Sequence, residues 1–184
     1  MVVSGTLGML PQNPQTLFVK KTVREDLFEI FTGSKLSRSE QEARVARMVS
    51  LCRMETLLDR HPYDLSGGEQ QRAALAKVLL LQPEILLLDE PITYLDVGYQ
   101  IEVLELVREL CSRLHITIVM VLHDMNFTAR YSDWVYVLKQ GRVFDHGRPD
   151  SILVRDTMKE VFHIDSQIIR DDKNGCPFLI PEKL

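Results

Sequence analysis

The 184-residue sequence has few cysteines, no long apolar run and no large excess of charge of either sign. Its cysteines, Cys52, Cys111 and Cys176, lie far apart and form no C-x-x-C pair, which argues against a disulfide framework or a cysteine metal site. The longest apolar runs, such as ITIVMVL, are far too short to span a bilayer. The net charge of -4 gives no electrostatic reason to expect nucleic acid or an anionic membrane surface as a partner.

The sequence also lacks a phosphate-binding loop of the type G-x-x-x-x-G-K-[ST]. What it does have is the composition of a soluble globular protein, with 45% hydrophobic and 26% charged residues. A chain of this length can form one domain with a substantial core and still have room for a small lobe.

The first third of the chain is expected to be a loop followed by a helical subdomain. Residues 1–20 are predicted to be irregular, because LPQNPQTLF contains two prolines and an Asn-Pro pair. TVREDLFEIF and SRSEQEARVARMVSLCRM then show helical periodicity, so residues 21–64 are predicted to form a small helical subdomain. Each helix is preceded by the spacing of a capping box, Thr22 with Glu25 and Ser37 with Glu40.

The rest of the chain, residues 65–184, has the pattern of a parallel sheet with helices. ILLLDEP is a continuous apolar run that ends in two acids, which predicts a strand buried on both faces. IEVLELVRELCSRL predicts a helix and ITIVMVLHD a second buried strand, so the three segments are expected to form a βαβ unit. WVYVLKQGRVFDHG and IIRDDKNGCPFLI predict two hairpins, the second turning at Asn174-Gly175. The predicted fold class is α/β, with a parallel-sheet core and a small helical subdomain.

Three polar residues follow the predicted buried strands. Asp89 and Glu90 stand at the carboxyl end of the first strand, where α/β proteins bind ligands. Asp89 can hold Mg²⁺ or its water, and Glu90 can orient and polarise an attacking water. His123 ends the second strand in the same way. Taken alone, Asp89 and Glu90 are better explained as the solvated end of a strand, and His123 as a packed or solvated histidine.

The stretch LSGGEQQR is more specific. Ser66 and Glu69 have the spacing of a third capping box, so a helix is expected to begin here and to stop before Pro83. Ser66 can also bind an anion, and Gly67 and Gly68 expose backbone N–H groups at the positive end of the helix dipole. An ordinary capped helix explains Ser66 and Glu69 but leaves the paired glycines unexplained.

The order of the motifs identifies the family that the chain resembles. LPQNP, LSGGEQQR, ILLLDEP, LD and LHD follow one another, with the helical lobe between the first two. In this order they resemble the motifs of the ABC (ATP-binding cassette) ATPases, which have a RecA-like P-loop NTPase core, over nearly the whole chain. The resemblance implies that Gln12 is the Q-loop glutamine, which senses Mg²⁺ and the γ-phosphate. It implies that Asp89 is the Walker B aspartate, a metal ligand together with Gln12, and that Glu90 is the catalytic glutamate.

The same resemblance assigns the remaining motifs. Leu95 and Asp96 would form the D-loop, with Asp96 near the nucleotide, and His123 would be the catalytic switch histidine. ATP and Mg²⁺ are the implied cofactors. The nucleotide-binding signature motif would be made of five consecutive residues, Leu65, Ser66, Gly67, Gly68 and Glu69.

The chain is similar to two importer subgroups. Up to about Pro91 it resembles the ATPases of energy-coupling-factor importers for vitamins and cobalt. From TYLDVGYQIEVLELV onward it is more similar to the ATPases that import iron-siderophores and cobalamin. Either the subgroup mixes these features, or the chain is a recombinant or mis-joined reading frame.

One departure from the family concerns the P-loop. In the family the P-loop and its strand precede the Q-loop by a few dozen residues, whereas only eleven residues precede Gln12 here. The chain is therefore expected to be an N-terminally truncated cassette that lacks the P-loop strand, with residues 1–20 a remnant of the catalytic core. In the family, two cassettes pair head to tail, and each ATP lies between one chain's P-loop and the other's signature motif. The phosphate bound by LSGGEQQR would then be held by the partner.

These implications give a function and its alternatives. The chain is expected to be a fragment of the ATP-hydrolysing subunit of a micronutrient importer, inactive alone because the P-loop is absent. Its expected partners are a second ABC ATPase subunit and a transmembrane permease at the inner face of the cell membrane, with no nucleic acid. The alternative is a truncated, non-catalytic cassette that pairs with a complete ABC ATPase and modulates it. A DNA-repair or chromosome-organising ATPase is disfavoured, because the lobe is too short for the long coiled coils of those proteins.

Overall fold

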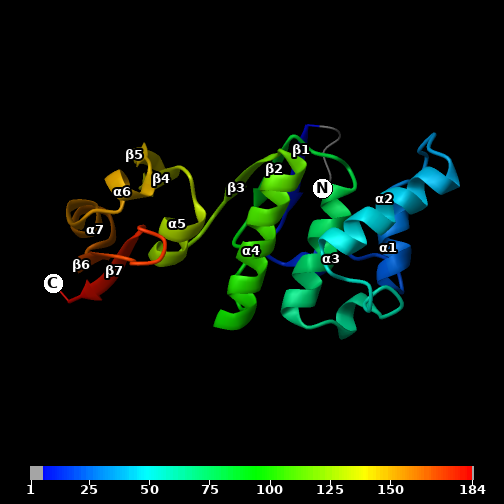
Figure 1. Ribbon diagram of the computed structural model, residues 1–184, viewed down its shortest axis with the longest axis horizontal. Coiled ribbons are helices and arrows are strands. Elements are labelled where there is room, and N and C mark those ends of the chain that lie inside the picture. Colours follow the sequence, from blue (N-terminus) through cyan, green and yellow to red (C-terminus); the bar gives the residue numbers. More distant parts are fainter. Residues whose placement is uncertain (1–5, 184) are drawn as a thin grey trace. The chain divides into compact units, whose positions relative to one another are not determined.

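The computed structural model describes residues 6–183 and divides the chain into two compact units, Met1–Val121 and Leu122–Leu184 (Figure 1). The first unit contains a parallel sheet and the longer helices, and the second contains two hairpins and three short helices. The division predicted from the sequence separates a helical subdomain from a catalytic core, and it stays a prediction.

A three-stranded parallel sheet, in the order β1-β2-β3, forms the centre of the first unit. Its strands are β1 (Leu7–Leu10), β2 (Ile85–Leu88) and β3 (Thr117–Met120). Helix α4 (Val97–Leu114) connects β2 to β3, so the predicted βαβ unit is confirmed. Because all three strands run in one direction, their carboxyl ends lie at the same edge of the sheet.

The prediction of a loop throughout residues 1–20 is wrong for the part that the structure describes. Leu7–Leu10 pair with β2 as a strand, and Pro14–Leu17 form the 3₁₀ helix η1. Glycine inside the strand allows this close packing, because a Cβ on Gly8 would lie 2.8 Å from Cγ1 of Val78. The prolines therefore follow the strand and do not interrupt it. The predicted start of the loop, residues 1–5, lies outside the described residues.

The helices of this part of the chain follow the sequence pattern closely. Residues 21–64 contain α1 (Val23–Glu29), α2 (Arg38–Leu51) and the 3₁₀ helix η2 (Pro62–Asp64), and α3 (Gly67–Leu79) follows them. All three predicted capping boxes, before α1, α2 and α3, are present with both of their hydrogen bonds. Helix α3 packs against β1, α1, α2 and α4 (Figure 1), and ten of its thirteen residues are buried.

Cys52, directly after α2, is fully buried, and burial raises the pKa of its thiol to about 12. The thiol is therefore protonated throughout the physiological pH range. Such a cysteine acts as a small apolar residue of the lobe's core.

The two sheet strands that were predicted to be buried on both faces differ from that prediction. In β2, Leu86 and Leu88 are buried while Ile85 is 37% exposed, so only one face is fully covered. In β3, Val119 is 51% exposed, and the expectation of a second fully buried strand is wrong. The reason is the position of β3, which is an edge strand in the sheet formed by residues 6–183.

The second unit contains both predicted hairpins. Strands β4 (Val135–Lys139) and β5 (Arg142–Gly147) form one, and β6 (Asp165–Arg170) and β7 (Pro177–Glu182) form the other. Gly175 has φ of +68° in the second turn, as expected for glycine in the predicted Asn-Gly turn. The helices of this unit are α5 (Met125–Tyr131), α6 (Pro149–Ile152) and α7 (Arg155–Phe162). Within residues 6–183, every helix is too short or too polar to cross a bilayer.

Candidate functional site

The carboxyl ends of β1 and β2 bring two predicted site residues into contact. Gln12 follows β1 and Glu90 follows β2, 78 positions apart in the sequence. The Gln12 side-chain amide donates a hydrogen bond to a carboxylate oxygen of Glu90, with an N···O distance of 2.7 Å. A hydrogen bond to a carboxylate is stronger than one between neutral groups. The predicted Q-loop glutamine and catalytic glutamate therefore share one site.

A third residue holds the same carboxylate, and the sequence analysis missed it. The Thr93 hydroxyl donates to Oε2 of Glu90 at 3.0 Å, and the Thr93 amide donates to the Glu90 carbonyl at 3.2 Å. Glu90 itself has φ of +47°, an uncommon conformation for a residue with a side chain. A hydroxyl three positions after the glutamate was the signal that could have identified Thr93.

Asp89 lies at the same edge of the sheet. Its amide donates to the Leu10 carbonyl at 3.0 Å, which continues the pairing of β1 and β2 by one residue. The Asp89 carboxylate and the Gln12 amide oxygen are hard oxygen donors of the kind that suits Mg²⁺. Residues 6–183 contain no cluster of three or more metal-ligating His, Cys, Asp or Glu side chains. That is compatible with Mg²⁺, which usually takes one or two carboxylates and completes its shell with water and phosphate.

The predicted signature motif forms the start of α3. Ser66 is the N-cap: its hydroxyl accepts a hydrogen bond from the Glu69 amide at 3.4 Å, and its amide donates to the Glu69 carboxylate at 2.8 Å. The backbone hydrogen bond from Ser66 is the main cause that holds the pKa of Glu69 below its usual value, and Arg60 adds to it. Ser66 is exposed, although most of α3 is buried. Leu65, directly before it, is buried.

The paired glycines have a packing role that the sequence analysis did not find. Neither Gly67 nor Gly68 has a positive φ. A Cβ on Gly67 would lie 2.8 Å from Cδ2 of Leu95, and one on Gly68 would lie 3.0 Å from Cδ1 of Tyr99. Both glycines therefore lie where the predicted D-loop and the first turn of α4 approach closely, and a Cβ at either position would fit only after the neighbouring side chain shifts. The packing explains the pair independently of any anion.

Asp96 caps α4, since its carboxylate accepts a hydrogen bond from the Tyr99 amide at 3.2 Å. The cap fixes the turn that carries Leu95 and Tyr99 against the glycines. The predicted contact of Asp96 with nucleotide stays a prediction, with this structural role beside it.

His123 belongs to the second unit, where it is exposed. The next residue, Asp124, caps α5 by accepting hydrogen bonds from the amides of Asn126 and Phe127, each at 2.8 Å. The role of His123 as a switch histidine stays a prediction.

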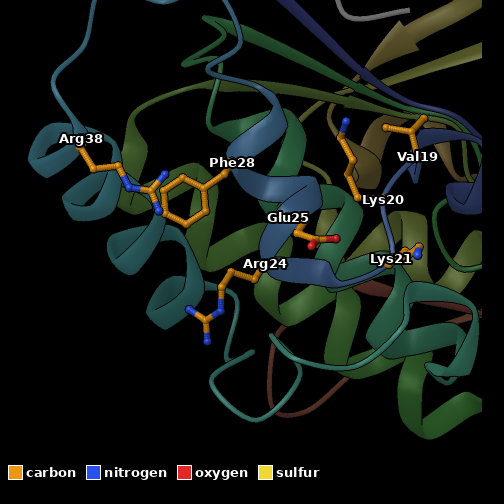
Figure 2. A pocket seen from close by; sticks show the side chains of 7 residues that line it. All are labelled: Val19, Lys20, Lys21, Arg24, Glu25, Phe28 and Arg38. Atoms are coloured by element: carbon orange, nitrogen blue, oxygen red, sulfur yellow. The ribbon is translucent and has the colours of Figure 1, made fainter.

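A groove with positively charged walls lies on the helical lobe and encloses about 750 Å³. Figure 2 shows its lining side chains, with the Arg38 guanidinium placed over the Phe28 ring at 4.1 Å. We call it the basic groove, and it is lined by Val19, Lys20, Lys21, Arg24, Glu25, Phe28 and Arg38. Two of its cations have anionic neighbours, Arg24 with Asp59 and Arg38 with Glu42. The sequence analysis did not identify this groove, because its cations are spread over two helices and a loop.

Comparison with known proteins gives consistent matches. The ABC transporter family matches residues 2–93 of the chain. The probable siderophore transport system ATP-binding protein YusV of Bacillus subtilis (strain 168) is 37% identical over 182 residues, which cover 97% of this chain and 66% of that protein. The petrobactin import ATP-binding protein FpuC of Bacillus anthracis is 37% identical over 187 residues, which cover 99% of this chain and 67% of that protein.

A solved structure gives the same result for the fold. The structure of cbiO1 from Clostridium perfringens, part of the ABC transporter complex cbiONQ, matches with a TM-score of 0.78 and 31% identity. The match covers 83% of this chain and 61% of that chain. The chain thus spans about two thirds of the length of the relatives it matches. The matches agree with the order of the motifs and with the contact between Gln12 and Glu90, and the chain belongs to the ABC transporter family.

Proposed function

We propose that the chain is the ATP-binding and ATP-hydrolysing subunit, or the larger part of one, of an importer for a micronutrient such as a ferric siderophore, cobalamin or cobalt. The observation that carries the proposal is the hydrogen bond between Gln12 and Glu90, which links two family motifs at the carboxyl edge of the sheet. The names of the relatives support the substrate class, since YusV and FpuC are ATP-binding proteins for siderophore transport and petrobactin import.

In the proposed reaction Glu90 orients and polarises the water that attacks the γ-phosphate of ATP. Gln12 and Thr93 hold its carboxylate in place through their hydrogen bonds. Asp89 and Gln12 would hold Mg²⁺, which neutralises charge on the phosphates when it is bound. The family resemblance further implies that Asp96 lies near the nucleotide and that His123 acts as a switch histidine, and both roles remain part of the proposal.

The signature motif is proposed to act on a nucleotide held by a second cassette in a head-to-tail pair. Ser66 is exposed at the start of a long buried helix, so its hydroxyl and the nearby N–H groups can face a partner. Donors fixed in this way stabilise negative charge that develops on a transferring phosphoryl group. The helical lobe, with its basic groove, would contact a transmembrane permease, which places the chain at the inner face of the cell membrane.

The proposal is tested by pairing this chain with a complete ABC ATPase and measuring ATP hydrolysis. The 184 residues contain no G-x-x-x-x-G-K-[ST] motif, so the part of an ATP site that they can supply to a partner is the signature motif, Leu65 to Glu69. The test therefore changes this motif. Ser66→Asp keeps a good N-cap but places a negative charge where the phosphate approaches. Loss of ~2–3 kcal/mol of transition-state stabilisation lowers the rate about 10²-fold.

Ser37→Asp is the matched control, because Ser37 caps α2 with the same capping box and lies outside the proposed site. We expect it to leave hydrolysis unchanged. The site that can form in this pair combines the partner's P-loop and catalytic glutamate with the signature motif of this chain. Glu90→Gln in this chain should therefore have little effect, whereas the equivalent change in the complete partner should abolish turnover. Equal rates for Ser66→Asp and Ser37→Asp would contradict the proposed role of the signature motif.

A further inference from the structure

A buried ion pair connects α3 to the segment that follows Gln12. The Lys77 ammonium lies 2.7 Å from Oδ1 of Asp26, and the two side chains are 6% and 1% exposed. Lys77 also donates a hydrogen bond to the Leu17 carbonyl at 2.7 Å. Lys77 belongs to α3 and Asp26 to α1, and Leu17 lies at the end of η1. One ammonium group therefore connects α3, α1 and η1.

The Asp26 carboxylate fixes the backbone beside the basic groove. It accepts hydrogen bonds from the Val19 amide at 3.0 Å and from the Lys20 amide at 3.3 Å. Val19 and Lys20 both line the groove. The Asp26 carboxylate thus holds the backbone of Val19 and Lys20, and Lys77 on α3 holds that carboxylate.

A second, partly buried link lies at the other end of α3, next to the signature motif. The Gln15 side chain donates to Oε1 of Gln70 at 3.2 Å. Gln70 in turn donates to the Leu65 carbonyl at 3.1 Å and the Pro62 carbonyl at 3.2 Å, and it is 7% exposed. The segment from Gln15 to Lys20 is therefore attached to α3 near both the start and the end of that helix.

The chemistry of the pair indicates a role in geometry more than in stability. An apolar pair of the same size would often be as stable, because burying two charges costs nearly as much as their attraction returns. Apolar side chains, however, would leave the amides of Val19 and Lys20 and the carbonyl of Leu17 without these partners. Asp26 and Lys77 satisfy all three groups at once, and such a network specifies a single arrangement.

We propose that Lys77 and Asp26 are positioning residues that hold the Val19–Lys20 wall of the basic groove and the signature motif as one rigid unit. The link runs from Asp26 through Lys77 into α3, and through Gln70 to the Leu65 carbonyl. A shift at either end is then transmitted to the other, because the helix between them is buried and close-packed. The functional part of this inference rests on the proposed signature role, whereas the structural part does not.

Native-state hydrogen exchange of the full chain tests the structural part. Lys77→Met should speed exchange at the Val19 and Lys20 amides, and also at the Glu69 and Gln70 amides, by about tenfold. Arg72→Met is the matched control, since Arg72 is also on α3 and donates to a different carbonyl, that of Arg53, at 3.0 Å. The control should leave these four amides unchanged. Faster exchange at Val19 and Lys20 alone would overturn the proposal, because the two ends would then be independent.

Lys77→Met leaves a buried carboxylate without its cation, so the variant can fail to fold. The double variant Asp26→Asn with Lys77→Met removes both charges and keeps a polar group at position 26. It should fold and still show faster exchange at both sets of amides. If it folds with the exchange pattern of the wild type, the charges do not hold the two ends together and the proposal is wrong.

The functional part is tested with the double variant in the mixed pair with a complete ABC ATPase. We expect KM for Mg-ATP to rise about tenfold and kcat to fall as well, because a less well placed signature motif binds the partner's nucleotide less tightly and stabilises its transition state less well. A purely structural role would lower the amount of active pair and leave KM unchanged. If the wild-type pair does not hydrolyse ATP, the proposed function fails, while the exchange experiment still decides the link between the groove and α3.

Discussion

Helix α3 and strand β3 are both rich in apolar residues, but the chain covers them very differently. In α3, Leu75 and Val78 are fully buried, and the helix is capped at its start by residues of this chain. In β3, Val119 is 51% exposed, and Val121, just beyond the strand, is 47% exposed. The difference shows that the signature end of the site has its supporting contacts within the described residues, whereas the β3 edge of the sheet has large apolar side chains in contact with solvent.

The strongest test of this difference compares one truncation in each element. Leu75→Ala should lower the free energy of unfolding by about 2–5 kcal/mol, because it leaves a cavity in a close-packed helix interface. Val119→Ala should change it by less than about 0.5 kcal/mol, as is usual for exposed sites. Urea denaturation followed by circular dichroism measures both values. Equal losses would mean that β3 is covered in solution by something that the described residues do not supply.

The next test concerns the contact between the signature glycines and α4. Gly68→Ala should carry a packing cost that cancels the gain of about 0.5–1 kcal/mol that alanine normally has over glycine in a helix, because its Cβ would lie 3.0 Å from Cδ1 of Tyr99. Tyr99→Ala should relieve this cost, so the two changes together should be less harmful than their sum. Thermal or urea unfolding of the four proteins of this cycle gives the coupling. Strict additivity would remove the packing explanation and leave the anion as the reason for glycine at this position.

The smallest expected effect is a pH dependence at the start of α3. Because the folded state lowers the pKa of Glu69 below its ordinary value of 4.5, this carboxylate stabilises the fold above that pH. The contribution is lost as the pH falls below 4.5 and through the lowered pKa. Glu69→Gln should therefore cost less than about 1 kcal/mol at neutral pH, and the gap from the wild type should close under acidic conditions. Urea unfolding at several pH values measures this gap, and a gap that widens under acid would contradict the assignment.

Local features of the fold were predictable from the sequence. The capping boxes at Thr22, Ser37 and Ser66 are each formed by residues three positions apart, so a short pattern contains all the information. The same holds for the two hairpins, whose turns connect neighbouring strands. The roles of Gln12 and Glu90 were implied only by recognising the order of the motifs, and their hydrogen bond is a finding of the structure.

Features that depend on distant parts of the chain were not predictable. Leu7–Leu10 form a strand only because Ile85–Leu88 lie beside them, and nothing local distinguishes the segment from a loop. The pairing of Lys77 with Asp26 joins residues 51 positions apart. The packing of Tyr99 against Gly68 likewise depends on how two helices meet. The exposure of β3 depends on which strands surround it, which the pattern of a single strand does not specify.

The burial of Cys52 makes its thiol a built-in reporter of how often the lobe opens. A thiol with a pKa of about 12 and no exposed surface is inert to alkylating reagents as long as α2 and α3 stay packed. Cys111 and Cys176 are partly exposed, so they can be replaced by serine to leave one reporter. The rate at which the Cys52 thiol is alkylated then measures how often the lobe opens, and no probe has to be added to the protein. The same measurement made with and without a complete ABC ATPase would show how far the partner slows those openings.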